Sequence, residues 1–162
     1  MESLVDRGLS RRSLCVRLIG TLAAVLGGSH LLAQVKPPLV VYRDPGCDCC
    51  LNWVAIMQKQ GYKVTMTDAV MGPIKQKYKV PPKLQSCHTT LVGTYVIEGH
   101  VPASDIAKLL AQKPKGVIGL TIPGMPASAP GMDQAPFRPY AVLTFDALGV
   151  TTVVAQHDKP AV

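Results

Sequence analysis

The sequence predicts an α/β protein whose core is one mixed β-sheet. An apolar, β-branched run from Leu39 to Arg43 is followed by apolar residues at helical spacing up to Gln60, and then by alternation from Tyr62 to Thr67. A strand, helix and strand in this order form a parallel unit with a right-handed crossover. Further along, two short apolar runs flank a turn at Gly93-Thr94, which is typical of an antiparallel hairpin. Parallel and antiparallel pairs are therefore expected in one sheet.

The first strand and helix are defined by their apolar residues. Leu39 to Arg43 is rich in β-branched residues, so a buried strand is expected. The helix begins at Cys49 or Cys50, and Gly61 supplies a C-terminal stop. Its apolar positions at helical spacing are Leu51, Val54, Ala55 and Met57.

The next elements complete a recognisable order. A short helix is expected from Pro73 to Tyr78, with Pro73 in its first turn and Pro81-Pro82 beyond its end. Strands follow at Thr89 to Val92 and Tyr95 to Glu98, and a helix runs from Pro102 to Ala111. The order strand, helix, strand, helix, strand, strand, helix is the thioredoxin-like succession, with a core at about residues 38–112.

Residues 113–157 form a C-terminal extension beyond this core. Gly116 to Pro139 is rich in proline and glycine, and is expected to be a stiff loop that folds back over the domain. It contains a small repeat, Pro123-Gly124-Met125 and Pro130-Gly131-Met132. Tyr140 to Phe145 and Thr151 to Ala155 then predict a hairpin.

Residues 1–33 have the pattern of a secretory signal peptide. Arginines precede or enter an apolar run from Leu18 to Leu26, which is too short to span a bilayer comfortably. Ser10 to Leu14 also resembles a twin-arginine export signal. We expect export to the periplasm, a mature domain at residues 34–162 and no stable membrane insertion after cleavage; an uncleaved anchor is the alternative.

The basic charge does not indicate a nucleic-acid partner. The formal net charge is +7, but the lysines are scattered singly and form no basic block interleaved with aromatic residues. The lysines in question are Lys75, Lys77, Lys79, Lys83, Lys108, Lys113 and Lys115. We interpret them as a solvated surface.

The main chemical signal is a group of three thiols at the first strand-to-helix turn. Cys47, Cys49 and Cys50 lie within four residues. Free backbone N–H groups at a helix start favour thiolate over thiol, and thiolate binds soft metals or attacks disulfides. Cys47 and Cys50 form a C-x-x-C pair, but disulfide exchange does not need the third sulfur of Cys49. The surplus sulfur is the first indication of a metal.

Cys87 and His88 form a second chemical cluster. In a thioredoxin-like topology, the residues that enter the third strand lie beside the turn that follows the first strand. Cys87 and His88 are therefore expected next to the three thiols, in one pocket of four sulfurs and an imidazole. His100 lies in an expected turn and is either an exposed histidine or a further ligand.

The ligand types favour a soft metal. Thiolates suit Cu(I), zinc or iron–sulfur clusters. Four cysteines would satisfy zinc but leave Met125 and Met132 without a role, and the cysteine spacing matches none of the usual iron–sulfur runs. Copper explains the two methionines best, although methionine is also an ordinary packing residue.

Two other uses of the cysteines remain open. An exported protein can hold structural disulfides, but bonds within this corner would close small loops and add little stability. A thiol-disulfide oxidoreductase would use Cys47 and Cys50, with Cys87 as a resolving partner. A copper chaperone or buffer without redox turnover would share every ligand with a copper oxidoreductase.

Several motifs resemble the CopG-type periplasmic copper-resistance proteins, a family once known only as a domain of unknown function. The similarity covers about residues 40–157. The motifs are Tyr42 to Cys47, Cys49-Cys50 and Trp53, Val80-Pro81-Pro82, Ser86-Cys87-His88-Thr89, Tyr95 to Pro102, and Pro123-Gly124-Met125-Pro126.

The resemblance implies a thioredoxin-like fold that binds several copper ions and contributes to copper tolerance, either with or without interconversion of Cu(I) and Cu(II). Carried over by position, the thiolate ligands are Cys47, Cys49, Cys50 and Cys87. It also implies ligand roles for His88, His100, Met125 and Met132. Other periplasmic copper-handling proteins are the expected partners.

Overall fold

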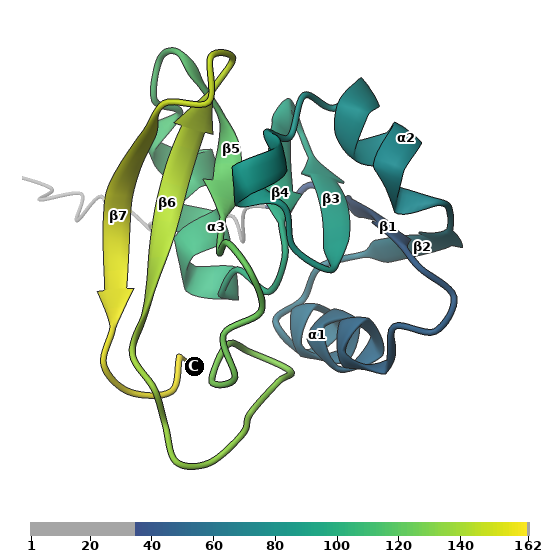
Figure 1. Cartoon of the computed structure of the whole chain (residues 1–162), viewed down its shortest axis with the longest axis vertical. Coiled ribbons are helices and arrows are strands. Elements are labelled where there is room, and N and C mark those ends of the chain that lie inside the picture. Colours follow the sequence, from purple (N-terminus) through teal and green to yellow (C-terminus); the bar gives the residue numbers. More distant parts are fainter. Residues whose placement is uncertain (1–34, 162) are drawn as a thin grey trace, which may run out of the picture. The chain divides into compact units, whose positions relative to one another are not determined.

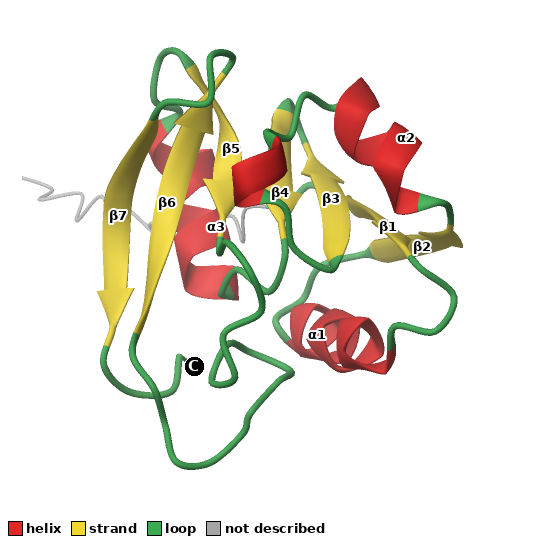
Figure 2. Cartoon of the chain, viewed as in Figure 1, coloured by secondary structure: helices red, strands yellow, loops and turns green. Residues whose placement is uncertain are grey.

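The computed structural model describes residues 35–161 (Figure 1, Figure 2). The expected signal peptide, with Cys15 and His30, lies outside the described residues. Within them, the helices are α1 (Asp48–Lys59), α2 (Met71–Lys77), a short 3₁₀ helix (Pro82–Leu84) and α3 (Ala103–Gln112). The strands are β1 (Leu39–Arg43), β2 (Val64–Asp68), β3 (His88–Val92), β4 (Tyr95–Glu98), β5 (Val117–Thr121), β6 (Tyr140–Asp146) and β7 (Thr151–His157).

All the strands of the described chain form one sheet, in the order β2-β1-β3-β4-β5-β6-β7. The pairs β1–β2 and β4–β5 are parallel, and the remaining neighbours are antiparallel. The predicted α/β fold with a mixed sheet is confirmed. Figure 1 shows β2 and β7 at the two opposite edges of this sheet. No helix in the described range has both the length and the apolar character that crossing a bilayer requires.

The sheet has a core on each face. Ile97 of β4 belongs to the larger core, together with Trp53 of α1 and Ile106 of α3. Its neighbour Val96 belongs to a smaller core with Leu84 of the 3₁₀ helix. Because successive strand residues point to opposite faces, α1 and α3 cover one face, whereas the 3₁₀ helix packs on the other.

β2 begins later than the sequence pattern predicts. Tyr62 was expected to open this strand, but its backbone N–H donates to the carbonyl of Met57 at 3.1 Å. Its side chain is almost fully buried in the larger core. Tyr62 therefore closes the end of α1, and β2 pairs with β1 only from Val64.

One strand, β5, is not predicted by the sequence pattern. The apolar run Val117–Thr121 was assigned to a long loop, but it forms β5, parallel to β4. The loop itself is shorter and runs over residues 122–139 between β5 and β6. Gly119 has no side chain, which allows β5 to approach β4 closely: a Cβ atom there would lie 1.8 Å from the Val96 carbonyl oxygen. The C-terminal extension therefore continues the sheet instead of lying beside it.

The loop at residues 122–139 packs against the start of α1. Gly131 has a φ of +85°, and a Cβ atom there would lie 2.7 Å from the backbone nitrogen of Trp53. The side-chain amide of Asn52 donates to the Gly131 carbonyl at 3.3 Å. The close approach of Gly131 to α1 holds the loop beside the helix that carries the cysteines.

We expect Gly119→Ala to lower the free energy of unfolding by about 3 kcal/mol, because the added methyl group overlaps the backbone of β4. Chemical denaturation measures the change. Gly72→Ala is the matched control: it lies in α2 with no atom near its Cβ position, and should raise the free energy by about 0.5 kcal/mol. Equal stability of wild type and Gly119→Ala would contradict the close β4–β5 contact.

Candidate metal centre

The cysteine turn joins β1 to α1 and is held by Arg43. The Arg43 guanidinium donates to the carbonyl oxygens of Pro45 at 3.2 Å and Cys47 at 3.1 Å. It also pairs with Asp68 of β2 at 3.0 Å. One side chain therefore connects the turn to the neighbouring strand, and this fixes the backbone that presents the thiols.

The cysteines of this turn are not all free. Cys47 and Cys50 form a disulfide bond, while Cys49 and Cys87 are free thiols. The sulfur of Cys49 lies 3.6 Å from that of Cys47. The C-x-x-C pair thus forms the disulfide that the oxidoreductase and structural-disulfide interpretations both allow.

The four sulfur atoms converge, as the topology predicts. Those of Cys47, Cys49, Cys50 and Cys87 all lie within 4.8 Å of one another. In a second group, a ligand atom from each of Cys50, Cys87, His88 and His100 meets the same distance limit. The sequence allows His100 to be either a turn residue or a ligand, and the structure brings it into the cluster.

Two histidines hold the sulfur of Cys87 between them. Its Sγ lies 2.9 Å from Nε2 of His100 and 3.2 Å from Nδ1 of His88. Nδ1 of His100 lies 2.7 Å from the Pro130 carbonyl, which can only accept, so Nδ1 carries the proton and the Nε2 lone pair faces Cys87. His100 therefore presents a free nitrogen donor to the cluster.

His88 is fully buried beside Trp53. The two ring centroids are 4.6 Å apart, and the indole N–H donates to the Val101 carbonyl at 3.0 Å. Nε2 of His88 has no hydrogen-bond partner among the described residues. Trp53 therefore belongs to the larger core and also packs against His88.

Burial sets the protonation of the cluster before any metal binds. It raises the pKa of Cys87 to about 12, with the neighbouring Cys49 as the next cause. Burial also lowers the pKa of His88 and of His100. At pH 7 Cys87 is therefore a thiol and both imidazoles are neutral.

The two methionines of the Pro-Gly-Met repeat occupy different environments. Met125 is 57% exposed and lines an open cleft of about 570 Å³ together with Cys47 and Cys87. Met132 is partly buried and packs against the larger hydrophobic core. Only Met125 lies at the mouth of the cysteine site.

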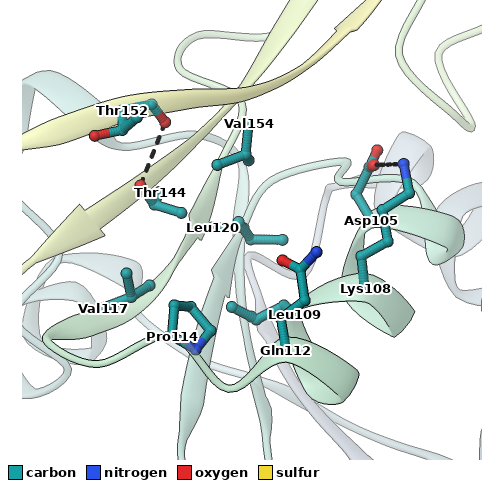
Figure 3. Close-up of a pocket in the computed structure, with 10 residues that line it drawn as sticks. All are labelled: Asp105, Lys108, Leu109, Gln112, Pro114, Val117, Leu120, Thr144, Thr152 and Val154. Carbon is teal, nitrogen blue, oxygen red and sulfur yellow. Dashed lines mark hydrogen bonds and ion pairs between the residues drawn. The ribbon is translucent and has the colours of Figure 1, made fainter.

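His157 and a separate pocket lie away from the cluster. The Nε2 atom of His157 is 2.7 Å from a carboxylate oxygen of Asp105, and its ring stacks on Tyr140. Figure 3 shows the pocket, of about 300 Å³, between α3 and the strands β5 to β7. Its lining contains no cysteine, histidine or methionine.

Sequence reasoning missed a buried charged network behind Cys87. Glu98 is fully buried and forms an ion pair with Lys75, which is 5% exposed. A carboxylate oxygen of Glu98 also accepts the Ser86 N–H at 2.7 Å, and the other accepts the Thr89 hydroxyl at 2.7 Å. The available signal was one acidic residue at the end of the apolar run Tyr95–Glu98.

A family model described as "Protein of unknown function, DUF411" matches residues 84–132. No curated protein matches the chain.

Two solved structures of the copper resistance protein CopG are similar. Form 1 is 33% identical with a TM-score of 0.71, and the match covers 76% of this chain and 99% of that one. Form 2 is 35% identical with a TM-score of 0.70, covering 75% of this chain and 98% of that one. Since nearly the whole length of each relative is matched at this level of identity, this chain belongs to the CopG family of copper resistance proteins.

Proposed function

We propose that this protein binds Cu(I) for copper resistance, as a thiolate-bridged cluster of several ions. The observation that carries the proposal is the meeting of four cysteine sulfurs and two imidazoles in overlapping donor groups. Thiolate and imidazole are suitable donors for Cu(I). The relatives are named as copper resistance proteins, which supports copper over the other soft metals.

His88 presents Nδ1 to the cluster, 3.2 Å from the Cys87 sulfur, and we propose this nitrogen as its donor to a metal. The buried carboxylate of Glu98 already accepts three hydrogen bonds or ion-pair contacts, so it is occupied elsewhere. The donors left for an ion are therefore sulfur and nitrogen, with the exposed thioether of Met125 at the cleft.

The two donor groups share Cys50 and Cys87. An ion among the four sulfurs and an ion beside His88 and His100 would therefore have two thiolates in common. Shared thiolates are the bridges that a cluster requires. We assign Met125 as the thioether that completes a low coordination number, whereas Met132, the second expected thioether ligand, packs against the core.

Copper loading by all four cysteines requires the Cys47–Cys50 disulfide to be reduced. One disulfide takes up two electrons and two protons to give two thiols, and a protein dithiol supplies both by becoming a disulfide itself. Cys47 lines the cleft and Cys50 is fully buried, so we propose that attack occurs at Cys47 and releases Cys50. In the oxidised state only Cys49 and Cys87 are free to bind.

The mixed donor set also bears on redox turnover. Thiolates favour Cu(I), whereas imidazole binds copper in either oxidation state. We propose that the His88 and His100 side of the cluster is where Cu(I) and Cu(II) interconvert, if the protein acts as a copper oxidoreductase. A storage or chaperone role would use the same ligands.

Thiol-disulfide exchange is the second candidate function, because the Cys47–Cys50 disulfide is present and one of its sulfurs lines the cleft. The strand order β2-β1-β3-β4, with α1 following β1, supports a thioredoxin-like fold for this part of the chain. The proposed periplasmic location, after removal of residues 1–33, suits either function. Periplasmic copper carriers are the proposed partners of the first.

We expect Cys49→Ser to lower the number of Cu(I) ions bound per chain by at least one while the fold is retained, because it removes one donor from the sulfur group. Elemental analysis gives the stoichiometry, and circular dichroism gives the fold. Asp48→Ser, with the same new residue one position earlier, should bind as much copper as wild type. Unchanged copper content in Cys49→Ser would rule out the three-thiolate turn.

The reduced protein should bind more Cu(I) than the oxidised protein, because reduction frees two further sulfurs. A thiol titration should differ by two thiols between the two states, and copper content is measured on each. The metal-free protein should also fail to accelerate insulin reduction. Rapid insulin reduction, together with equal copper content in both states, would favour the oxidoreductase instead.

Copper affinity should fall as the pH is lowered from 8 to 5. The pKa of Cys87 is raised to about 12, so Cu(I) must displace its proton at every pH in this range. The affinity should change by about tenfold per pH unit for each proton displaced. Competition with a chromophoric Cu(I) chelator at several pH values measures this, and a flat profile would show that no thiol proton leaves.

A further inference from the structure

A buried ion pair lies next to the metal centre without belonging to it. Lys75 of α2 and Glu98 of β4 are both almost fully removed from solvent. Burying an ion pair is seldom more stabilising than apolar packing of the same volume, because both charges lose their hydration. The position of the pair in the fold is therefore more informative about its role than its contribution to stability.

The Glu98 carboxylate accepts hydrogen bonds from residues on both sides of Cys87. It accepts the backbone N–H of Ser86, immediately before Cys87, at 2.7 Å. It also accepts the hydroxyl of Thr89, two residues after Cys87, at 2.7 Å. Thr89 and Glu98 are directly opposite in the antiparallel pair of β3 and β4, so the carboxylate reaches both groups without leaving the sheet.

The residues after Glu98 continue the same contact. Gly99 has a φ of +75°, and a Cβ atom there would lie 2.4 Å from the Ser86 hydroxyl oxygen. Its N–H donates to the His88 carbonyl at 2.9 Å. His100 then places Nε2 at 2.9 Å from the Cys87 sulfur. The consecutive residues Glu98, Gly99 and His100 thus contact the backbone on both sides of Cys87 and the Cys87 sulfur itself.

Lys75 brings α2 into this arrangement. Its ammonium group pairs with Glu98 and donates to the Thr89 hydroxyl at 3.3 Å. Thr89 and its neighbour His88 point to opposite faces of the sheet, and the ring of His88 packs against Trp53 of α1. The ammonium group is therefore on the face of the sheet opposite α1, and α2 supports the metal centre although it supplies no ligand.

We infer that the Lys75–Glu98 pair is a positioning pair that fixes Cys87 for copper binding. This inference rests on the copper-binding function proposed above. Residues that hold metal ligands from outside commonly change metal affinity by about 10- to 100-fold when they are replaced. The pair touches no proposed ligand atom. It should therefore act on the backbone of Ser86, and through that backbone on the position of the Cys87 sulfur.

The test compares Lys75→Met, Glu98→Gln and the double variant, all as reduced, full-length protein. Each single variant leaves one polar partner of the pair without its charge complement. We expect each to weaken Cu(I) affinity at least about tenfold, and to speed the alkylation of Cys87 in the metal-free protein. Chelator competition measures the affinity, and peptide mass spectrometry follows alkylation at Cys87.

The double variant separates positioning from general destabilisation. Its amide can still accept the Ser86 N–H and no buried charge remains, so copper affinity and Cys87 alkylation should return toward wild type. Thr89→Val is the second test if the charge variants fail to fold. It removes a single hydroxyl and should shift both measurements in the same direction as the single charge variants, by a smaller factor. Lys108→Met is the control, because it removes an exposed lysine from an ion pair with Asp105 that has no contact with the Cys87 segment.

Wild-type alkylation rates in the single variants and in Thr89→Val would overturn the inference. The inference would also fail if the double variant bound Cu(I) no more tightly, and were alkylated at Cys87 no more slowly, than the single variants. The copper-binding proposal is decided separately, by whether the reduced wild type binds copper. Since alkylation is measured without metal, the positioning role can succeed or fail whatever that result is.

Discussion

The position of β3, between β1 and β4, is the constraint on which the candidate metal centre depends. Antiparallel pairing sets Arg43, at the end of β1, opposite His88, at the start of β3. The turn after β1, which carries Cys47, and the residue before β3, which is Cys87, must therefore lie at the same end of these strands. Because β4 is antiparallel to β3, it ends at Glu98 beside the start of β3, and His100 therefore lies next to Cys87.

Burial gives this cluster its chemical character. The same loss of solvent that raises the pKa of Cys87 lowers the pKa of His88 and His100, which keeps the metal-free site uncharged at these three positions. A soft cation could then replace the thiol proton. The one carboxylate behind Cys87 is balanced by Lys75, so a negative charge is present near the site without being free to act as a hard ligand.

Local sequence patterns predicted most elements of the first part of the chain, because apolar spacing, glycine and proline act over a few residues. The meeting of Cys87 with the cysteine turn was predictable once the element order suggested the topology. β5 was missed because its apolar residues, Val117–Thr121, continue into a proline- and glycine-rich loop, and its place in the sheet depends on distant β4. The different environments of Met125 and Met132 were equally hidden, since the repeat is locally the same at both positions.

The sequence by itself determined the donor types: three thiols at a helix start, a second cysteine-histidine pair, and no comparable group of oxygen ligands. Only the tertiary structure decided which histidine nitrogen faces the sulfur, that Cys47 and Cys50 are joined, and that Glu98 accepts the backbone N–H of Ser86, next to Cys87. The reason is physical. Donor chemistry belongs to each residue, whereas protonation, bond partners and position depend on burial and on strands far apart in the chain.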